Sequence, residues 1–268
     1  MTHPRLAVSE MCTYRWTFAE ELTLWDELGI RQVGLLLNKI EDHGRDAVAA
    51  ALKERAAVAT TVITRNFDLA APETWDATRA TLDRAIDIAA EFGGCPYFTP
   101  GRPDGRTFDE LAAALAQAVA PCAAYAESRG VRLAIEPTLR ADQSFVHTLR
   151  EAIAVADRAG IGLIADLGNS WPEDGVEDTV RRAGSRIAVV QLCDVVTGTA
   201  EPPPPGDRAV PGDGDLDLTR FVAAALDAGY TGAFELELVG PRIEAEGHAS
   251  ATRRAVERAN TLLERVLP

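Results

Sequence analysis

The sequence is poor in lysine and cysteine and contains no long apolar run. Lys39 and Lys53 are its only lysines, and only Lys39 could lie at a strand end, where a Schiff-base barrel enzyme needs its lysine. The four cysteines, at positions 12, 95, 122 and 193, form no CxxC pair, which argues against a disulfide framework or a zinc ribbon and favours buried, reduced thiols. No apolar stretch approaches the roughly 20 residues needed to cross a bilayer. Nothing at the start of the chain resembles a signal peptide, so we expect a soluble, cytoplasmic protein.

Positive charge is also scarce. The chain has 27 Lys and Arg against 41 Asp and Glu, which gives a formal net charge of −14. Such an acidic chain is unsuited to bind nucleic acid or an anionic membrane surface. We therefore expect neither of these as a partner.

The chain does contain one repeated pattern, a short apolar run followed by a longer, Ala-rich segment of helical period, about eight times over. Strands are expected to begin near Leu6, Gln32, Val58, Cys95, Val131, Ile161, Ile187 and Ala233. Helices are expected over 17–28, 46–54, 72–92, 107–129, 148–159, 176–183, 217–228 and 249–267. Alternating strands and helices form a parallel sheet, and eight such units in a chain of this length favour a closed barrel. The predicted fold is of the α/β class, a single (β/α)8 TIM barrel domain spanning residues 1–268.

Polar side chains stand at the ends of four consecutive strands of this pattern. The runs are Leu-Ala-Ile-Glu136, Leu-Ile-Ala-Asp166, Val-Val-Gln191 and Glu-Leu-Glu237. Barrel enzymes place catalytic and metal-binding groups at the C-terminal ends of their strands. Three carboxylates gathered without a cation would repel one another, and with an amide oxygen they form an oxygen-only set that suits Mg²⁺, Mn²⁺ or Co²⁺ better than Zn²⁺. We predict that these four residues bind one divalent metal ion.

Two neighbouring segments bear on the same site. Glu235 lies two residues before Glu237 and points to the same side of the strand, so we expect it to support the ligands from one level below. The segment Gly198–Gly214 is rich in Pro and Gly and follows the seventh strand. We expect a loop there that lies over the catalytic face as a lid or substrate wall, rather than a linker.

These motifs, in this order and spacing, resemble the sugar phosphate isomerase/epimerase family, whose members are xylose isomerase-like TIM barrels. The resemblance is carried by LAIEPT with Glu136, LIADLGNSW with Asp166, VVQLCD with Gln191 and Asp194, RAVPGDGDLDL with Arg208, and GYTGAFELEL with Glu237. It implies one Mn²⁺, Mg²⁺ or Co²⁺ held by Glu136, Asp166, Gln191 and Glu237, with Glu136 and Glu237 as the catalytic pair. It also implies a homodimer or homotetramer. The three-metal cluster of the related abasic-site endonucleases needs several histidines, and an acidic chain with four in all does not suit that activity.

The chain departs from the common family pattern at two positions. Gln191 stands where most members have His, which is similar to hydroxypyruvate isomerases and 3-dehydroshikimate dehydratases rather than to ketose 3-epimerases. Asn169 stands where members often carry His, three residues after the metal-binding Asp, and this counts against the dehydratase assignment.

The resemblance implies a metal-dependent isomerase or epimerase that acts on a keto-sugar, a cyclitol or a small hydroxy-keto acid through an enediolate. A lyase that dehydrates 3-dehydroshikimate or an inosose uses the same intermediate and is the alternative, as is a barrel that binds a sugar without turnover. No Gly-rich turn opens a helix after the seventh or eighth strand, so an unphosphorylated substrate is preferred.

Several residues are expected to contact this substrate. The resemblance implies that role for Arg208, which could instead pair with Asp207 or Asp213. The positions of the others in the predicted loops suggest pocket walls, although packed or surface positions would also suit them; they are Asn169, Trp171, His147, Asn66 and Arg65.

Overall fold

The chain closes into a barrel of eight parallel strands, which confirms the predicted fold class. The computed structural model describes residues 2–198 and 207–267. Going around the barrel, the strands are β1 (Leu6–Ser9), β10 (Phe234–Leu236), β7 (Ile187–Leu192), β6 (Gly162–Asp166), β5 (Ala134–Ile135), β4 (Cys95–Phe98), β3 (Val58–Ile63) and β2 (Gln32–Leu36).

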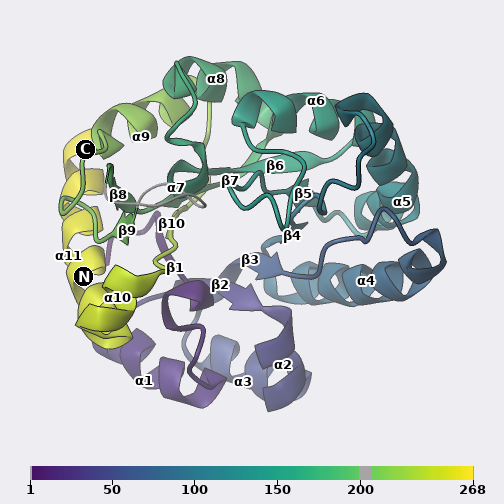
Figure 1. Cartoon of the computed structure of the whole chain (residues 1–268). Coiled ribbons are helices and arrows are strands. Elements are labelled where there is room, and N and C mark those ends of the chain that lie inside the picture. The colour runs from purple at the N-terminus through teal and green to yellow at the C-terminus, as the bar shows by residue number, and fades with distance from the viewer. Residues whose placement is uncertain (1, 199–206, 268) are drawn as a thin grey trace.

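Helices surround the strands, and Figure 1 shows them as an outer ring with the two chain ends on the same side of the molecule. They are α1 (Phe18–Leu28), α2 (Leu37–His43), α3 (Arg45–Glu54), α4 (Trp75–Phe92), α5 (Phe108–Ser128), α6 (Leu149–Ala159), α7 (Leu167–Ser170), α8 (Val176–Ala183), α9 (Leu218–Asp227), α10 (Pro241–Glu246) and α11 (His248–Val266). Short 3₁₀ helices are η1 (Glu10–Thr13), η2 (Pro72–Thr74) and η3 (Gly184–Arg186). Within the described ranges, none of the helices combines the length and the apolar character needed to cross a membrane.

The strands can carry a site because every second side chain of a barrel strand points inward. The main apolar core lies between the strands and the helices. A second, smaller buried cluster comprises Cys95, Tyr97, Ala134, Ile164 and Val189. Two residues further along their strands, the inward positions that follow Ala134, Ile164 and Val189 change from apolar to polar. The polar residues at these positions are Glu136, Asp166 and Gln191.

Most expected elements begin within a residue or two of their predicted positions, but β5 does not. It begins at Ala134, three residues later than expected. The reason is that the Val131 amide donates to the Ala126 carbonyl and so still belongs to the end of α5. A capping box begins α5, since the Thr107 hydroxyl accepts from the Glu110 amide and the Glu110 carboxylate accepts from the Thr107 amide.

Three short helices, α2, α7 and α10, stand where the sequence predicts loops. Helix α7 is the one that matters for the site, because it begins directly after Asp166. The Asp166 carboxylate accepts a hydrogen bond of 2.9 Å from the Gly168 amide and so caps this helix. One side chain therefore ends a strand, begins a helix and faces the site.

A small antiparallel sheet extends the face at the C-terminal ends of the barrel strands. It pairs β8 (Asp194–Val196) with β9 (Asp207–Ala209). The prediction of a loop throughout Gly198–Gly214 is therefore wrong for β9, and residues 199–206 lie outside the described residues. The buried Asp194 carboxylate fixes the chain after β9, because it accepts from the amides of Gly212 (2.8 Å) and Leu216 (3.1 Å). These two bonds hold together segments that are about 20 residues apart in sequence.

Candidate metal centre and active-site cavity

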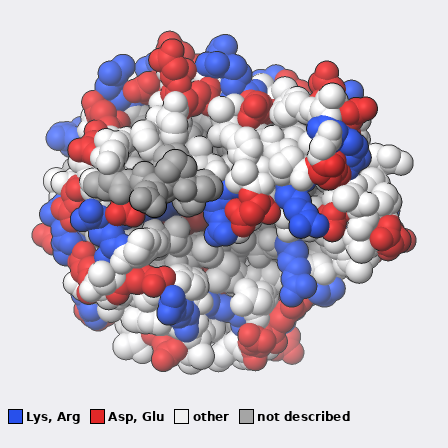
Figure 2. All heavy atoms as spheres, viewed as in Figure 1, with Lys and Arg blue, Asp and Glu red and all other residues white. Residues whose placement is uncertain are grey.

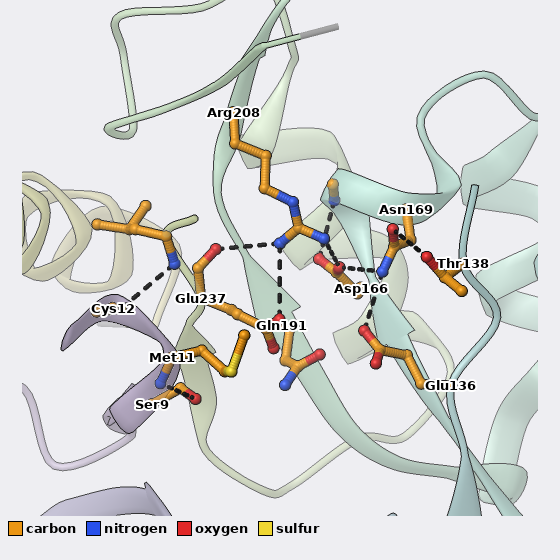
Figure 3. A network of polar contacts seen from close by, with 12 residues as sticks. Ser9, Met11, Cys12, Glu136, Thr138, Asp166, Asn169, Gln191, Arg208 and Glu237 are labelled. Atoms are coloured by element: carbon orange, nitrogen blue, oxygen red, sulfur yellow. Dashed lines mark hydrogen bonds and ion pairs between the residues drawn. The ribbon is translucent and has the colours of Figure 1, made fainter. Parts of the chain in front are cut away.

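Three carboxylates converge at the C-terminal ends of β5, β6 and β10. One oxygen from each of Glu136, Asp166 and Glu237 lies within 4.8 Å of the others. All three side chains are buried, with residue exposures of 6%, 0% and 5% respectively. The backbone fixes their level, because the Glu136 amide donates to the Phe98 carbonyl and the Glu237 amide to the Leu192 carbonyl. Figure 3 shows Glu136 and Glu237 on either side of Asp166.

Asn169 joins two of these carboxylates. Its Nδ2 donates to Glu136 Oε1 at 2.9 Å and to Asp166 Oδ2 at 2.8 Å. Its Oδ1 accepts from the Thr138 hydroxyl at 3.2 Å, which fixes the orientation of the amide. Asn169 therefore holds the two carboxylates close together and orients them, as a hydrogen-bond donor next to metal ligands commonly does.

Arg208 supplies the positive charge of the cluster. Its Nη2 donates to Asp166 Oδ2 at 2.6 Å and its Nη1 donates to the Glu237 carbonyl at 3.1 Å, while the Glu237 carboxylate lies 3.9 Å away. The guanidinium therefore reaches into the site between Asp166 and Glu237, as Figure 3 shows. The alternative pairing with Asp213 does not occur, because that carboxylate accepts from Arg254 and Arg258.

The close approach of Arg208 depends on a glycine. A Cβ atom at Gly168 would lie 2.8 Å from Arg208 Cζ and 2.5 Å from Cys193 Sγ, closer than real Cβ atoms come to their neighbours. The glycine of the Asp-Leu-Gly motif therefore leaves the space in which the guanidinium lies.

Gln191 lies at the level of Asp166, its register partner across the β6–β7 pair. Its Nε2 donates to the Tyr97 hydroxyl (3.1 Å) and to Glu235 Oε1 (2.9 Å). Its Oε1, by contrast, is buried and has no hydrogen-bond partner among the described residues. A buried acceptor without a partner is costly, and a metal ion would satisfy it. Together with the three carboxylates, it forms the donor set predicted for Mg²⁺, Mn²⁺ or Co²⁺, so these residues fit such an ion.

A second polar layer supports the first from below. Glu235 is buried and accepts from Gln191, from the Thr61 hydroxyl at 3.0 Å and from the Thr60 hydroxyl. Gly34 makes room for it, since a Cβ there would lie 2.6 Å from Glu235 Oε2. Tyr97 donates to Glu237 Oε2 at 3.3 Å.

Sequence reasoning missed Tyr97. The signal for it was its place two residues after Cys95 on β4, which puts a hydroxyl-bearing side chain inside the barrel.

Burial dominates the electrostatics of the cluster. It raises the pKa of Glu136 well above its usual range, and the charges of Glu237 and Asp166 raise it further. Burial also raises the pKa of Glu237 to about 8, with Arg208 opposing and Asp166 adding to the shift. Burial opposes the charge on Arg208 as well, but Asp166 and the neighbouring carboxylates outweigh it, and the pKa of Arg208 is raised. Without a further cation, the cluster therefore retains protons at neutral pH.

A cavity of about 1130 Å³ opens above this cluster. Of the predicted site residues, those that line it are Glu136, Glu237, Arg208, Asn169, Asn66 and Arg65. Asp166 and Gln191 lie beneath the wall and do not line it. His147 and Trp171 are also absent from the described lining: the His147 ring contacts the Thr138 carbonyl at 2.9 Å, and Trp171 packs against the apolar core. Their contact with substrate stays a prediction that this geometry does not support.

Comparisons with solved structures show the same fold over nearly the whole chain. Protein SMc04130 from Sinorhizobium meliloti 1021 superimposes with a TM-score of 0.85 at 23% identity, covering 97% of this chain and 98% of that one. The IolI protein, solved with a bound zinc atom, gives a TM-score of 0.85 at 16% identity and coverages of 98% and 99%. D-psicose 3-epimerase from Clostridium cellulolyticum H10, solved with D-tagatose, gives 0.74 at 14% identity and 98% of both chains. At these identities the likeness shows the fold alone.

Sequence comparison places the chain in a family. No curated protein sequence matches it. The family model described as xylose isomerase-like TIM barrel does match, over residues 22–262. Since that match covers most of the sequence, the chain belongs to the xylose isomerase-like TIM barrel family.

Proposed function

We propose that this protein is a divalent-metal-dependent isomerase or epimerase of a small substrate in which a carbonyl stands next to a hydroxyl-bearing carbon. The observation that carries the proposal is the pair of buried glutamates, Glu136 and Glu237, which both line the cavity and both lie against Asp166. Glu136, Asp166, Gln191 and Glu237 would hold the ion, and the ion would supply Lewis-acid stabilisation of the negative charge that develops on the substrate oxygens.

The different burial of the four residues supports different roles for them in this proposal. Asp166 and Gln191 lie below the cavity wall, so they can serve the ion but cannot reach a substrate carbon. Glu136 and Glu237 face the cavity from β5 and β10 and can exchange a proton with a substrate bound there. One glutamate takes the proton from the hydroxyl-bearing carbon. Its return to the other face of that carbon gives epimerisation, and its return to the neighbouring carbon gives isomerisation.

The remaining groups orient this pair. Tyr97 donates to the Glu237 carboxylate, which holds one of its oxygens in place. Asn169 holds the Glu136 carboxylate from the side of Asp166. Arg208 lines the cavity beside Asp166 and can turn toward a substrate oxygen.

The comparisons support the reaction class without identifying the substrate. Structures described as those of D-psicose 3-epimerase and L-ribulose 3-epimerase share this fold. The structure of the IolI protein, which has the same fold, contains a bound zinc atom. The all-oxygen donor set of this chain favours Mg²⁺, Mn²⁺ or Co²⁺ instead.

Proton exchange in D₂O tests the proposal. The protein, freed of metal by a chelator and reloaded with Mg²⁺, is incubated with a panel of ketoses, inososes and hydroxy-keto acids, and loss of the carbon-bound proton is followed by NMR. We expect metal-dependent exchange that Glu237→Gln reduces by roughly 10²-fold or more. Glu244→Gln is the matched control, because Glu244 also lines the cavity but pairs with Arg15, away from the cluster.

Three results would contradict the proposal. Exchange could be absent from the whole panel with Mg²⁺ bound, which would indicate a binding protein without turnover. Exchange could also be unaffected by Glu237→Gln when the metal content is unchanged. Finally, an ultraviolet-absorbing enone product would indicate a dehydratase instead.

A further inference from the structure

The metal ligands occupy only one half of the barrel. Glu136, Asp166, Gln191 and Glu237 come from β5, β6, β7 and β10, which are neighbours around the ring. The other half consists of β4, β3, β2 and β1. A substrate whose carbonyl end lies over the ligands can extend its remaining atoms over this second half, which we call the β1–β4 wall.

The β1–β4 wall carries a single charge. Its described lining residues are Met11, Tyr14, Ile63, Thr64, Arg65, Asn66, Tyr97, Phe98 and Thr99. Arg65 is the charged residue among them, and it lies two residues after the end of β3. The carboxylates that line the cavity belong to the ligand half and to the connections after its strands. They are Glu136, Asp142, Asp207, Glu237 and Glu244.

Arg65 is also without a partner, which is unusual in this acidic chain. Within the described parts of the chain, Arg65 and Arg242 are the arginines whose guanidinium groups form neither a hydrogen bond nor an ion pair. The other two cavity arginines are engaged, since Arg140 pairs with Asp142 at 3.0 Å and Arg208 with Asp166 at 2.6 Å. On the face seen in Figure 2, acidic and basic side chains are otherwise interspersed.

The position of β3 places the unpaired guanidinium of Arg65 across the barrel from β7. The strands β3 and β7 lie four places apart in the ring of eight, on opposite sides of the barrel. The connection after β7 carries Asp207 and Arg208, so a substrate would meet Asp207 at one end and Arg65 at the other. A ligand that covered Arg65 with a neutral group would remove its hydration without replacing it, which costs free energy. A carboxylate would compensate, because its two oxygens match the fork of the guanidinium.

We propose that the substrate is a hydroxy-keto acid whose carboxylate binds Arg65 while its carbonyl end faces the glutamate pair. This inference rests on the proposed function, which fixes where the carbonyl end lies. Asn66 lies beside Arg65 on the same wall. Its hydrogen bond to the Gln143 carbonyl is long, at 3.5 Å, so the amide is free to bind the same carboxylate. The single free guanidinium favours a monoanionic carboxylate over a phosphate, which usually takes several backbone donors at a helix N-terminus.

Matched ligands test the inference directly. D-Fructose, D-fructuronate and D-fructose 6-phosphate share one carbonyl end and differ only in the group at C6, which is hydroxymethyl, carboxylate or phosphate. D-Tagatose and D-tagaturonate repeat the first comparison on a second skeleton. Binding of each to the Mg²⁺-loaded protein is measured by calorimetry, which needs no turnover, and proton exchange in D₂O is measured alongside.

We expect at least one uronate to bind more tightly than its parent sugar by about tenfold to hundredfold, the range for a charged hydrogen bond. Arg65→Gln should abolish that preference by raising the Kd and KM of the uronate far more than those of the neutral sugar. Arg242→Gln, which removes the other unpartnered arginine outside the cavity, should have no effect.

Several results would overturn the inference. They are equal binding or no binding of sugar and uronate on both skeletons, a preference that survives Arg65→Gln, and tightest binding of the phosphate. Arg65-dependent uronate binding without any proton exchange would instead overturn the proposed function and leave the carboxylate site standing.

Discussion

Replacing Asn169 with leucine should weaken metal binding without unfolding the protein. Leucine keeps the size of the side chain but removes the Nδ2 group that donates to Glu136 at 2.9 Å and to Asp166 at 2.8 Å. Each of these hydrogen bonds ends on a charged acceptor, a class worth about 1.5–3 kcal/mol. Without them, repulsion drives the two carboxylates apart, so the ligand pair is no longer held ready for the ion.

The expected size of the effect follows from the same contacts. Loss of a group that orients metal ligands typically lowers metal affinity by about 10–100-fold. That range corresponds to about 1.4–2.7 kcal/mol of binding free energy. The measurement is the Kd for Mg²⁺ or Mn²⁺ by calorimetry, with thermal unfolding of the metal-free variant as a check on folding.

A neighbouring residue provides the control. The Ser170 hydroxyl donates to the Asp166 backbone carbonyl at 2.7 Å and touches neither carboxylate. Ser170→Ala should therefore cost some stability but leave the metal Kd unchanged. If Asn169→Leu binds the metal as tightly as the wild type does, Asn169 does not organise the ligands and the reasoning fails.

Two further predictions concern the charge balance of the cluster. Gly168→Ala would place a Cβ 2.8 Å from Arg208 Cζ and push the guanidinium from its position. The value of kcat/KM should therefore fall by roughly 10²-fold while the metal content stays the same. Unchanged kinetics would contradict this prediction. Because burial raises the pKa of Glu237 from 4.5 to about 8, the folded metal-free protein binds an extra proton between these values. Its free energy of unfolding should therefore fall as pH rises from about 4.5 to about 8, as measured by urea unfolding at several pH values. Mg²⁺ should suppress this fall, and a flat or rising curve without metal would show that the carboxylate is not desolvated.

Much of the fold could be predicted because the period of apolar residues reports burial directly. The strand ends at Glu136, Asp166, Gln191 and Glu237 were visible because each follows an apolar run. The short helix α7 was not, since the residue that caps it, Asp166, was already interpreted as the end of a strand. Asp166 accepts a hydrogen bond from the Gly168 amide and so begins the helix, but the same residues are equally typical of a turn after a strand.

The contacts within the site were less accessible than its position. Arg208 meets Asp166 rather than Asp213 because β9 pairs with β8, and that pairing depends on chain segments that a local pattern does not connect. Tyr97 was missed because a tyrosine in an apolar strand looks like a packing residue until its hydroxyl is seen beside Glu237. The contact of His147 with substrate stays a prediction from its place in the strand-5 loop, and in the structure its ring contacts the Thr138 carbonyl.

The division of the barrel into two halves has a consequence for how such a protein can change. The ligands come from β5, β6, β7 and β10, whereas the opposite cavity wall is built by the segments after β1, β3 and β4. Substitutions that are well separated and share no partners tend to act independently. Residues on the second half can therefore be exchanged to accept a new substrate while the proton-transferring half stays intact. A library restricted to positions such as Met11, Thr64 and Thr99 would be a compact route to new specificities on the same chemistry.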